Sequence, residues 1–157
     1  MSNFVGCLKV WQQAEKVFAC NMIMSNDIAS IEFPQWKFKD YDIKITFADW
    51  NIKTYEIKRD LKAEETSNFV IEFRCSWKPS WIYYSKADYI VYYVLWKFWI
   101  QERWELILRL IDTEKRIAKW WDWRRAEMYV IKADELSNLF TPAFEDDTNN
   151  WEMNNSQ

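Results

Sequence analysis

The chain has 157 residues, of which 50% are hydrophobic and 29% are charged, and its formal net charge is −3. This length and balance fit one globular domain with a sizeable core and exclude an intrinsically disordered chain. The longest strongly apolar run, residues 90–96, is far shorter than the roughly 20 residues that a membrane-spanning helix needs, so no membrane partner is expected.

The first half of the chain predicts one helix followed by a series of strands. Residues 8–24 place apolar side chains at helical spacing, and residues 31–38 are typical of an edge strand that tolerates a proline. Residues 41–47 and 51–60 alternate between apolar and polar side chains around the turn-like ADWN, which predicts a hairpin. A further strand is expected at residues 68–75.

The second half predicts a second hairpin, then a helix, a strand and a last helix. Residues 88–95 and 97–102 form the expected hairpin. Residues 103–118 predict an amphipathic helix with four side chains directed toward the core: Trp104, Ile107, Leu108 and Ile111. A short strand is expected at residues 128–133 and a helix at residues 134–140.

This order of elements predicts a single α/β (α+β) domain with a mixed central sheet flanked by helices. Residues 1–140 are expected to form the domain, and residues 141–157 an acidic, flexible C-terminal tail. The tail contains four acids and no base, so the remainder of the chain is close to neutral and any contact with nucleic acid needs a local basic cleft. A dinucleotide-binding fold is not expected, because glycine-rich phosphate loops are absent.

Two features of the composition limit the chemistry. The chain has no histidine, which excludes Ser-His-Asp and Cys-His hydrolysis. Its three cysteines are widely spaced and form no CxxC pair, so neither a zinc site nor a disulfide framework is expected. An enzyme of this composition would rely on carboxylates, lysine and a hard cation such as Mg²⁺. The cysteines and an N-terminus unlike a secretory signal predict a cytoplasmic location.

The hairpin predicted at residues 42–60 carries three charged side chains near one end: Asp42, Glu56 and Lys58. With Asp49 and Trp50 at the centre of the turn, Asp42 lies opposite Ile57, and the acid and lysine of the second strand share one face. Two carboxylates can hold Mg²⁺, and an ammonium can position the attacking water, so this set suits phosphodiester hydrolysis. Periodicity alone favours the simpler interpretation, a hairpin with a pair of solvated charges.

Several segments carry a resemblance to a known family. Asp42 followed by YEIK resembles the D…(D/E)-x-K core of the PD-(D/E)XK nuclease superfamily, which has a restriction-endonuclease-like fold. The segments TSNFVIEF, WKPSWI and SKADY resemble the T-G-N-x-x-I-E, G-K-P-S-G-I and K-A-D-Y motifs of small nucleases from phage and related genomes. KWWDWRRAEMYVIKADEL is similar to that group's G-G-D stretch, strand and final helix. The resemblance covers about residues 10–140 and implies a Mg²⁺-dependent DNA endonuclease in a prokaryotic or phage-infected cell.

The resemblance also implies roles for individual residues. Asp42 and Glu56 would bind Mg²⁺, for which Mn²⁺ could substitute, with the Ile57 carbonyl as a further ligand. Lys58 would assist the attacking water. Glu15 on the first helix matches an acid that many members place beside the metal, although a helix-surface charge is an equally good interpretation.

The later motifs imply contacts with DNA, and five residues match them: Thr66, Asn68, Lys78, Ser80 and Lys86. Lysine and serine are common partners of backbone phosphates. Glu72 would lie beside the metal ligands or be an exposed strand glutamate, and Asp88 is expected to be a structural cap or part of an ion pair. The basic segment 115–125 could line a groove, but a solvated helix face is favoured.

Tryptophan or serine stands where the family pattern has glycine. The chain has one glycine and 12 tryptophans. The affected positions are Ser67, Trp77, Trp81, Trp120 and Trp121, joined by Trp50 and Trp96 because they fall in expected turns. Glycine is used where φ is positive or where backbones approach closely, so altered loops are expected. Stacking of some of these indoles on nucleic-acid bases is the alternative.

Three functions from different classes therefore remain. The leading one is a DNA endonuclease, for which two cuts in a duplex would favour a homodimer. The second is a catalytically inactive nuclease-fold protein that binds DNA. The third is a structural or oligomer-forming protein with an aromatic surface, which the acid–acid–lysine set disfavours.

Overall fold

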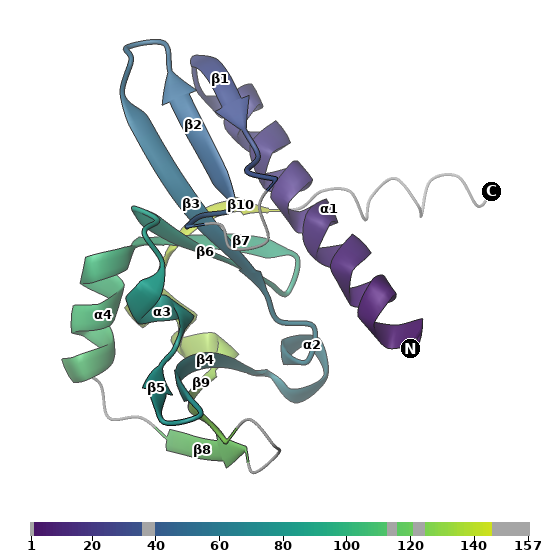
Figure 1. The fold of residues 1–157 in the computed structure, drawn as a ribbon, viewed down its shortest axis with the longest axis vertical. Coiled ribbons are helices and arrows are strands. Elements are labelled where there is room, and N and C mark those ends of the chain that lie inside the picture. The colour runs from purple at the N-terminus through teal and green to yellow at the C-terminus, as the bar shows by residue number, and fades with distance from the viewer. Residues whose placement is uncertain (1, 36–39, 113–115, 121–124, 146–157) are drawn as a thin grey trace.

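The computed structural model describes residues 2–35, 40–112, 116–120 and 125–145, which form two sheets and several helices (Figure 1). The helices are α1 (Ser2–Ser25), α2 (Ala63–Thr66), α3 (Trp81–Tyr84), α4 (Arg103–Asp112), the 3-10 helix η1 (Ala133–Glu135) and α5 (Leu136–Leu139). The strands are β1 (Ile28–Glu32), β2 (Ile43–Phe47), β3 (Ile52–Arg59), β4 (Asn68–Cys75), β5 (Lys78–Pro79), β6 (Tyr89–Val94), β7 (Lys97–Glu102), β8 (Arg116–Trp120), β9 (Ala126–Lys132) and β10 (Thr141–Glu145).

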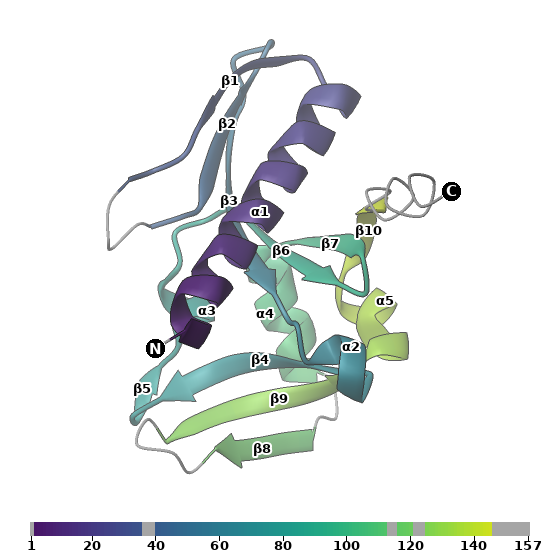
Figure 2. The same cartoon turned by 90° about the vertical axis from the view of Figure 1, so that its right-hand side faces the viewer.

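The larger sheet has six strands in the order β1-β2-β3-β6-β7-β10. β3 and β6 are parallel, and every other neighbouring pair is antiparallel. A mixed central sheet flanked by helices in a single α+β domain is therefore confirmed. The smaller sheet, in the order β5-β4-β9-β8, is antiparallel throughout and lies beyond one end of the larger sheet (Figure 2).

One core lies between α1 and the larger sheet. Phe18 of α1 is fully buried, with its ring centroid 5.3 Å from that of Tyr55 and 5.7 Å from that of Phe98. Ile43 and Ile45 of β2 are buried in the same cluster. Because side chains alternate along a strand, the residues of β3 between the buried ones must point to the opposite face. That alternation directs the polar face of β3 away from α1.

A second core joins the other face of the larger sheet to the smaller sheet and α4. Phe69 of β4, Tyr92 of β6 and Phe140 pack edge to face, with ring centroids 5.4–6.3 Å apart. α4 and α1 lie on opposite sides of the molecule (Figure 1). The polar face of β3 thus borders this second core.

The helix predicted at residues 103–118 is shorter than expected, and a different face of it is buried. α4 ends at Asp112, and Arg116–Trp120 form β8, an edge strand paired with β9. Leu106, Ile107 and Leu110 are buried, whereas three of the side chains expected in the core are exposed: Trp104, Leu108 and Ile111. Both Glu102 carboxylate oxygens accept hydrogen bonds from the backbone nitrogens of Trp104 and Glu105, which fixes where the helix begins and hence its phase.

Two other boundaries differ from the sequence-based predictions. The edge strand expected at residues 31–38 occurs earlier, as β1, and residues 36–39 lie outside the described part of the chain. Residues 141–145, expected to begin the tail, form β10 and pair with β7, so the domain extends to at least residue 145. The rest of that segment is not described. Within the described residues, no helix is long and apolar enough to cross a membrane.

Candidate functional site

The β2–β3 hairpin is the predicted one, with its register shifted by one residue. Ile43 pairs with Tyr55 and Thr46 with Ile52, so each residue of β2 faces a residue of β3 one position earlier in the sequence than predicted. The shift arises because a three-residue loop, residues 48–50, connects the strands and is closed by a hydrogen bond from Phe47 N to Asn51 O. The ladder ends at Ile43 and Tyr55, and the backbone nitrogen of Asp42 donates to Tyr55 O, so Asp42 lies just beyond the last paired position and beside β3.

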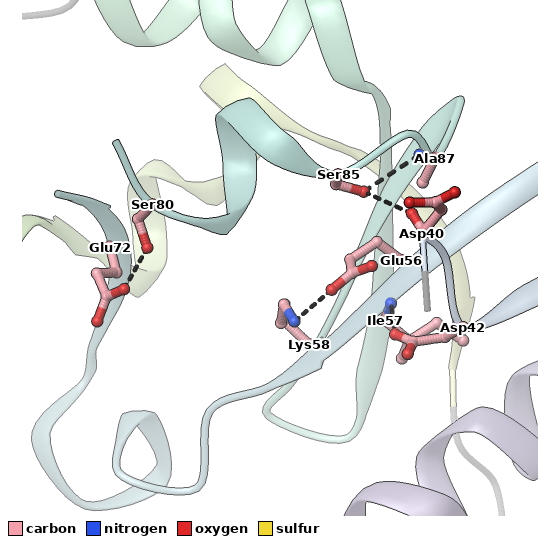
Figure 3. Close-up of polar contacts among 9 residues, drawn as sticks. All are labelled: Asp40, Asp42, Glu56, Ile57, Lys58, Glu72, Ser80, Ser85 and Ala87. Carbon is pink, nitrogen blue, oxygen red and sulfur yellow. Dashed lines mark hydrogen bonds and ion pairs between the residues drawn. The ribbon is translucent and has the colours of Figure 1, made fainter. Parts of the chain in front are cut away.

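Asp42 is a buried acid at the point where β2 ends. Only 6% of its surface is exposed, and its Oδ2 accepts a hydrogen bond of 2.6 Å from the backbone nitrogen of Ile57 (Figure 3). The carboxylate thus takes the place of a missing β2 partner beside β3. In an antiparallel ladder the N–H and C=O groups of one residue point to the same edge, so the Ile57 carbonyl also faces this edge.

Glu56 and Lys58 share the polar face of β3, as predicted. Lys58 Nζ donates to Glu56 Oε1 at 2.5 Å, and the two side chains are only 18% and 12% exposed. Figure 3 shows the Glu56 carboxylate turned toward Lys58, while the Asp42 carboxylate lies at Ile57 N. The expected acid–acid–lysine set is therefore gathered at one end of the hairpin.

Trp81 is also part of this site, although its place in the sequence indicated only a replaced loop glycine. Its ring centroid lies 4.7 Å from Lys58 Nζ and 6.4 Å from the ring centroid of Tyr92. Trp81 is the first residue of α3, and it packs against the second core. A cation over an indole face is attracted by the ring quadrupole, so Lys58 is held between Glu56 and this ring.

Glu15 lies on α1, which packs on the other face of the larger sheet, and its side chain is partly buried. Among the described residues, no three carboxylates or cysteines form a cluster that could hold a metal ion. Glu15 is therefore not gathered with Asp42 and Glu56 into a three-carboxylate centre. Its catalytic role stays a prediction.

A second polar cluster surrounds the Tyr92 hydroxyl. This group is buried and donates to Val70 O at 3.1 Å. Burial raises the pKa of Tyr92 well above its ordinary value, and three nearby carboxylates add to the effect: Asp60, Glu72 and Glu56. Asp60 also accepts hydrogen bonds from three backbone nitrogens, of Lys62, Ala63 and Val70, so it joins α2 to β4. Neither Tyr92 nor Asp60 was identified from the sequence, because their partners are distant along the chain.

The five candidate DNA contacts fall into two groups. Ser80 is buried, and its hydroxyl donates a hydrogen bond to Glu72 (Figure 3). The Thr66 hydroxyl donates to Asn68 O and the Asn68 amide donates to Thr66 O, on either side of Ser67, whose backbone is left-handed. These three side chains shape loops, and their DNA contacts stay predictions.

Lys78 on β5 and Lys86 before β6 are exposed. Lys86 Nζ lies 3.1 Å from Asp40 Oδ2, in a pair that is 72% and 52% exposed. Asp88 caps β3 through Thr54, whose backbone nitrogen and hydroxyl both donate to it, which confirms the expected structural cap.

The basic segment 115–125 is not the expected helix face. Its residues 116–120 form β8, and residues 115 and 121–124 lie outside the described part of the chain. Arg125 is exposed, and its guanidinium lies 5.7 Å from the Trp77 ring centroid.

The comparisons with known proteins identify the fold. No protein-family model matches the chain, and no curated protein does. Among solved structures, a bacterial homing endonuclease, I-Ssp6803I, is similar with a TM-score of 0.50. The alignment covers 91% of this chain and 88% of that chain at 14% sequence identity. At this identity the similarity shows a shared, nuclease-like fold.

Proposed function

We propose that this protein is a metal-dependent DNA endonuclease of the PD-(D/E)XK type. One observation carries the proposal: Asp42, Glu56 and Lys58 meet at the end of a hairpin within a fold that a homing endonuclease shares over 91% of the chain. Such a protein acts on DNA in the cytoplasm of a prokaryotic or phage-infected cell. A homodimer would supply the two sites needed to cut both strands of a duplex.

The donor set fits a hard divalent cation. Asp42, Glu56 and the Ile57 carbonyl offer only oxygen atoms, and Mg²⁺ is usually held by one or two carboxylates together with water and substrate phosphate. Mn²⁺ would suit the same ligands. The bound cation would lower the pKa of a coordinated water and offset charge that develops on the phosphate. Glu56 would turn from Lys58 toward Asp42 to join this ligand set.

Lys58 has two tasks in the proposed reaction. Its ammonium orients the attacking water and stabilises negative charge on the phosphate, as a preorganised donor does. The Trp81 ring and the Glu56 carboxylate hold this ammonium in place before substrate binds. Glu15 would assist from α1, as the resemblance implies.

The DNA backbone would approach over β5 and the segment before β6. Lys78 and Lys86 are exposed there, and phosphate contacts of this kind position a duplex without reading its sequence. Ser80 would support this surface by shaping its loop, whereas Thr66 and Asn68 lie at the other end of β4 and would contact the duplex there.

Cleavage of supercoiled plasmid and of branched DNA in Mg²⁺ or Mn²⁺ tests the proposal. Parent protein is compared with Glu56→Ala and Lys58→Ala, and each variant is expected to lose at least about 100-fold in rate. Arg109→Ala is the matched control, because Arg109 pairs with Glu105 within α4, a helix that carries none of the proposed metal ligands or DNA contacts, and this variant should cut normally. Cleavage that survives both site substitutions would refute the assignment.

A second candidate function is DNA binding without cleavage. The short Glu56–Lys58 contact and the indole beside Lys58 favour it, because both limit access to the ammonium. This function predicts salt-sensitive DNA binding that does not depend on metal, with no hydrolysis in either cation.

A further inference from the structure

Three β-hairpin turns place a tryptophan where the backbone is left-handed. φ is 65° at Trp50, 67° at Trp77 and 62° at Trp96. These turns connect β2 to β3, β4 to β5 and β6 to β7. A bulky residue with positive φ is a steric outlier, since its Cβ crowds the neighbouring carbonyl.

Each turn is of a type that selects glycine at the position in question. Cys75 pairs with Lys78 and Val94 with Lys97, so two residues connect the strands in both cases. Both central residues of these turns have positive φ, as in type I′ turns, which favour glycine at the second position. The loop at residues 48–50 has three residues and ends in the left-handed conformation, which is also usually taken by glycine.

Within the described part of the chain, only surface contacts accompany the strain at these positions: Trp77 lies beside Arg125, and Trp96 beside Tyr93 and Arg59. Trp50 is 80% exposed, Trp77 is 68% exposed and Trp96 is 41% exposed. An indole that was retained for its apolar contacts would instead be largely buried, which is not so for Trp50 and Trp77. Trp81, by contrast, begins α3 without positive φ and packs against the core, so it carries no such signal.

The composition of the whole chain is also poor in glycine and rich in tryptophan. One glycine accompanies 12 tryptophans, and that glycine lies inside α1. Among the described residues, seven have positive φ and none of them is glycine. Independent substitution of three separate turns by the same bulky residue has no physical advantage. A single cause that exchanges one amino acid for the other explains all three.

We propose that positions 50, 77 and 96 are glycine in the protein made by its native cell. The cause is the triplet UGA, which some genetic codes read as tryptophan and others as glycine. Three UGA triplets decoded as glycine would give each hairpin the residue that its backbone conformation requires. The proposal concerns the identity of the turn residues and does not depend on the nuclease activity.

The gene and the native protein provide the first test. UGA is expected at all three positions, and a UGG triplet at any one of them overturns the proposal, because UGG specifies tryptophan. Mass spectrometry of the protein purified from its native cells should find glycine in the three corresponding peptides. Tryptophan in any of those peptides overturns the proposal equally.

Thermal unfolding of the full chain tests the conformational argument separately. Trp50→Gly, Trp77→Gly and Trp96→Gly should each raise the unfolding midpoint by about 3 °C. Trp104→Gly is the matched control, because Trp104 is also exposed but lies in α4, where glycine should lower the midpoint. If the unfolding midpoint decreases in the three turn variants, as it does in the control, the turns do not require glycine.

Discussion

Lys58 Nζ lies 2.5 Å from Glu56 Oε1, and both side chains leave the same face of β3 with less than a fifth of their surface exposed. A pair so poorly solvated interacts more strongly than one on the surface, because water screens it less. It also brings the proposed water-positioning group within reach of a proposed metal ligand. The energetics of this pair therefore bear on both stability and function.

A double-mutant cycle should reveal this coupling. Glu56→Gln and Lys58→Met, alone and together, are expected to give an interaction energy of about 1 kcal/mol in the free energy of unfolding, measured by urea denaturation. The Asp40–Lys86 pair is the control: it is largely exposed, so its cycle should give at most about 0.5 kcal/mol. Equal values for the two cycles would contradict the partial burial of the first pair.

Two substitutions of Asp42 should separate the contribution of its charge from the contribution of its hydrogen bond. Asp42→Asn keeps an oxygen that can accept from Ile57 N, so its stability should stay within about 1 kcal/mol of the parent, while metal-dependent cleavage is lost. Asp42→Ala leaves that buried N–H without its acceptor and should cost about 1–3 kcal/mol as well. Thermal unfolding and plasmid cleavage are measured on both variants. Full cleavage by Asp42→Asn would exclude Asp42 as a metal ligand.

Lys78 and Lys86 should affect DNA affinity and leave the fold unchanged. Lys78→Ala and Lys86→Ala are each expected to reduce the slope of log affinity against log salt by about 1, because one phosphate contact is lost. Fluorescence anisotropy with labelled duplex at several salt concentrations measures this slope. Lys97→Ala is the control. Lys97 begins β7 and pairs with Val94, at the end of β6 opposite to Lys86, so this variant should leave the slope unchanged. A slope unaltered in all three variants would place the DNA elsewhere.

Local patterns predicted the hairpin and the residues gathered at its end. Alternation along β2 and β3 was enough to bring Asp42, Glu56 and Lys58 together, and the error was a single residue of register. That error depended on a loop in which Trp50 adopts a left-handed conformation, which no propensity scale assigns to tryptophan. Strand alternation is thus a strong local signal, and loop geometry is a weak one.

Contacts between segments that are far apart in the chain could not be predicted from the sequence. Two apolar stripes were compatible with helix α4, and Glu102 selected the one containing Leu106 and Leu110. β8 lies at an edge of the smaller sheet and pairs with β9, a partner that the local sequence does not reveal, so its charged residues resembled a helix surface. Likewise, Trp81 meets Lys58 only because α3 packs against the second core. Tertiary packing decides such cases.

Buried tyrosines should make the protein sensitive to alkaline pH. Burial raises the pKa of Tyr92 well above 10.0 and that of Tyr55 in the same direction, so both hydroxyls stay protonated in the native state. Above about pH 10 the unfolded chain loses these protons and the native chain keeps them, so stability falls as the pH rises further. Below that pH the two states bind the same number of tyrosine protons and this effect vanishes.

Tyr92→Phe should remove part of this alkaline loss. The variant is expected to be about 1 kcal/mol less stable at neutral pH, because Val70 O loses its donor, yet to lose less stability between about pH 8 and about pH 11. Urea denaturation across this range gives the comparison. Tyr83→Phe is the control for removing the hydroxyl of an exposed ring, because Tyr83 is 42% exposed. Parallel stability curves for Tyr92→Phe and the parent would show that the Tyr92 hydroxyl ionises equally in the folded and unfolded chains.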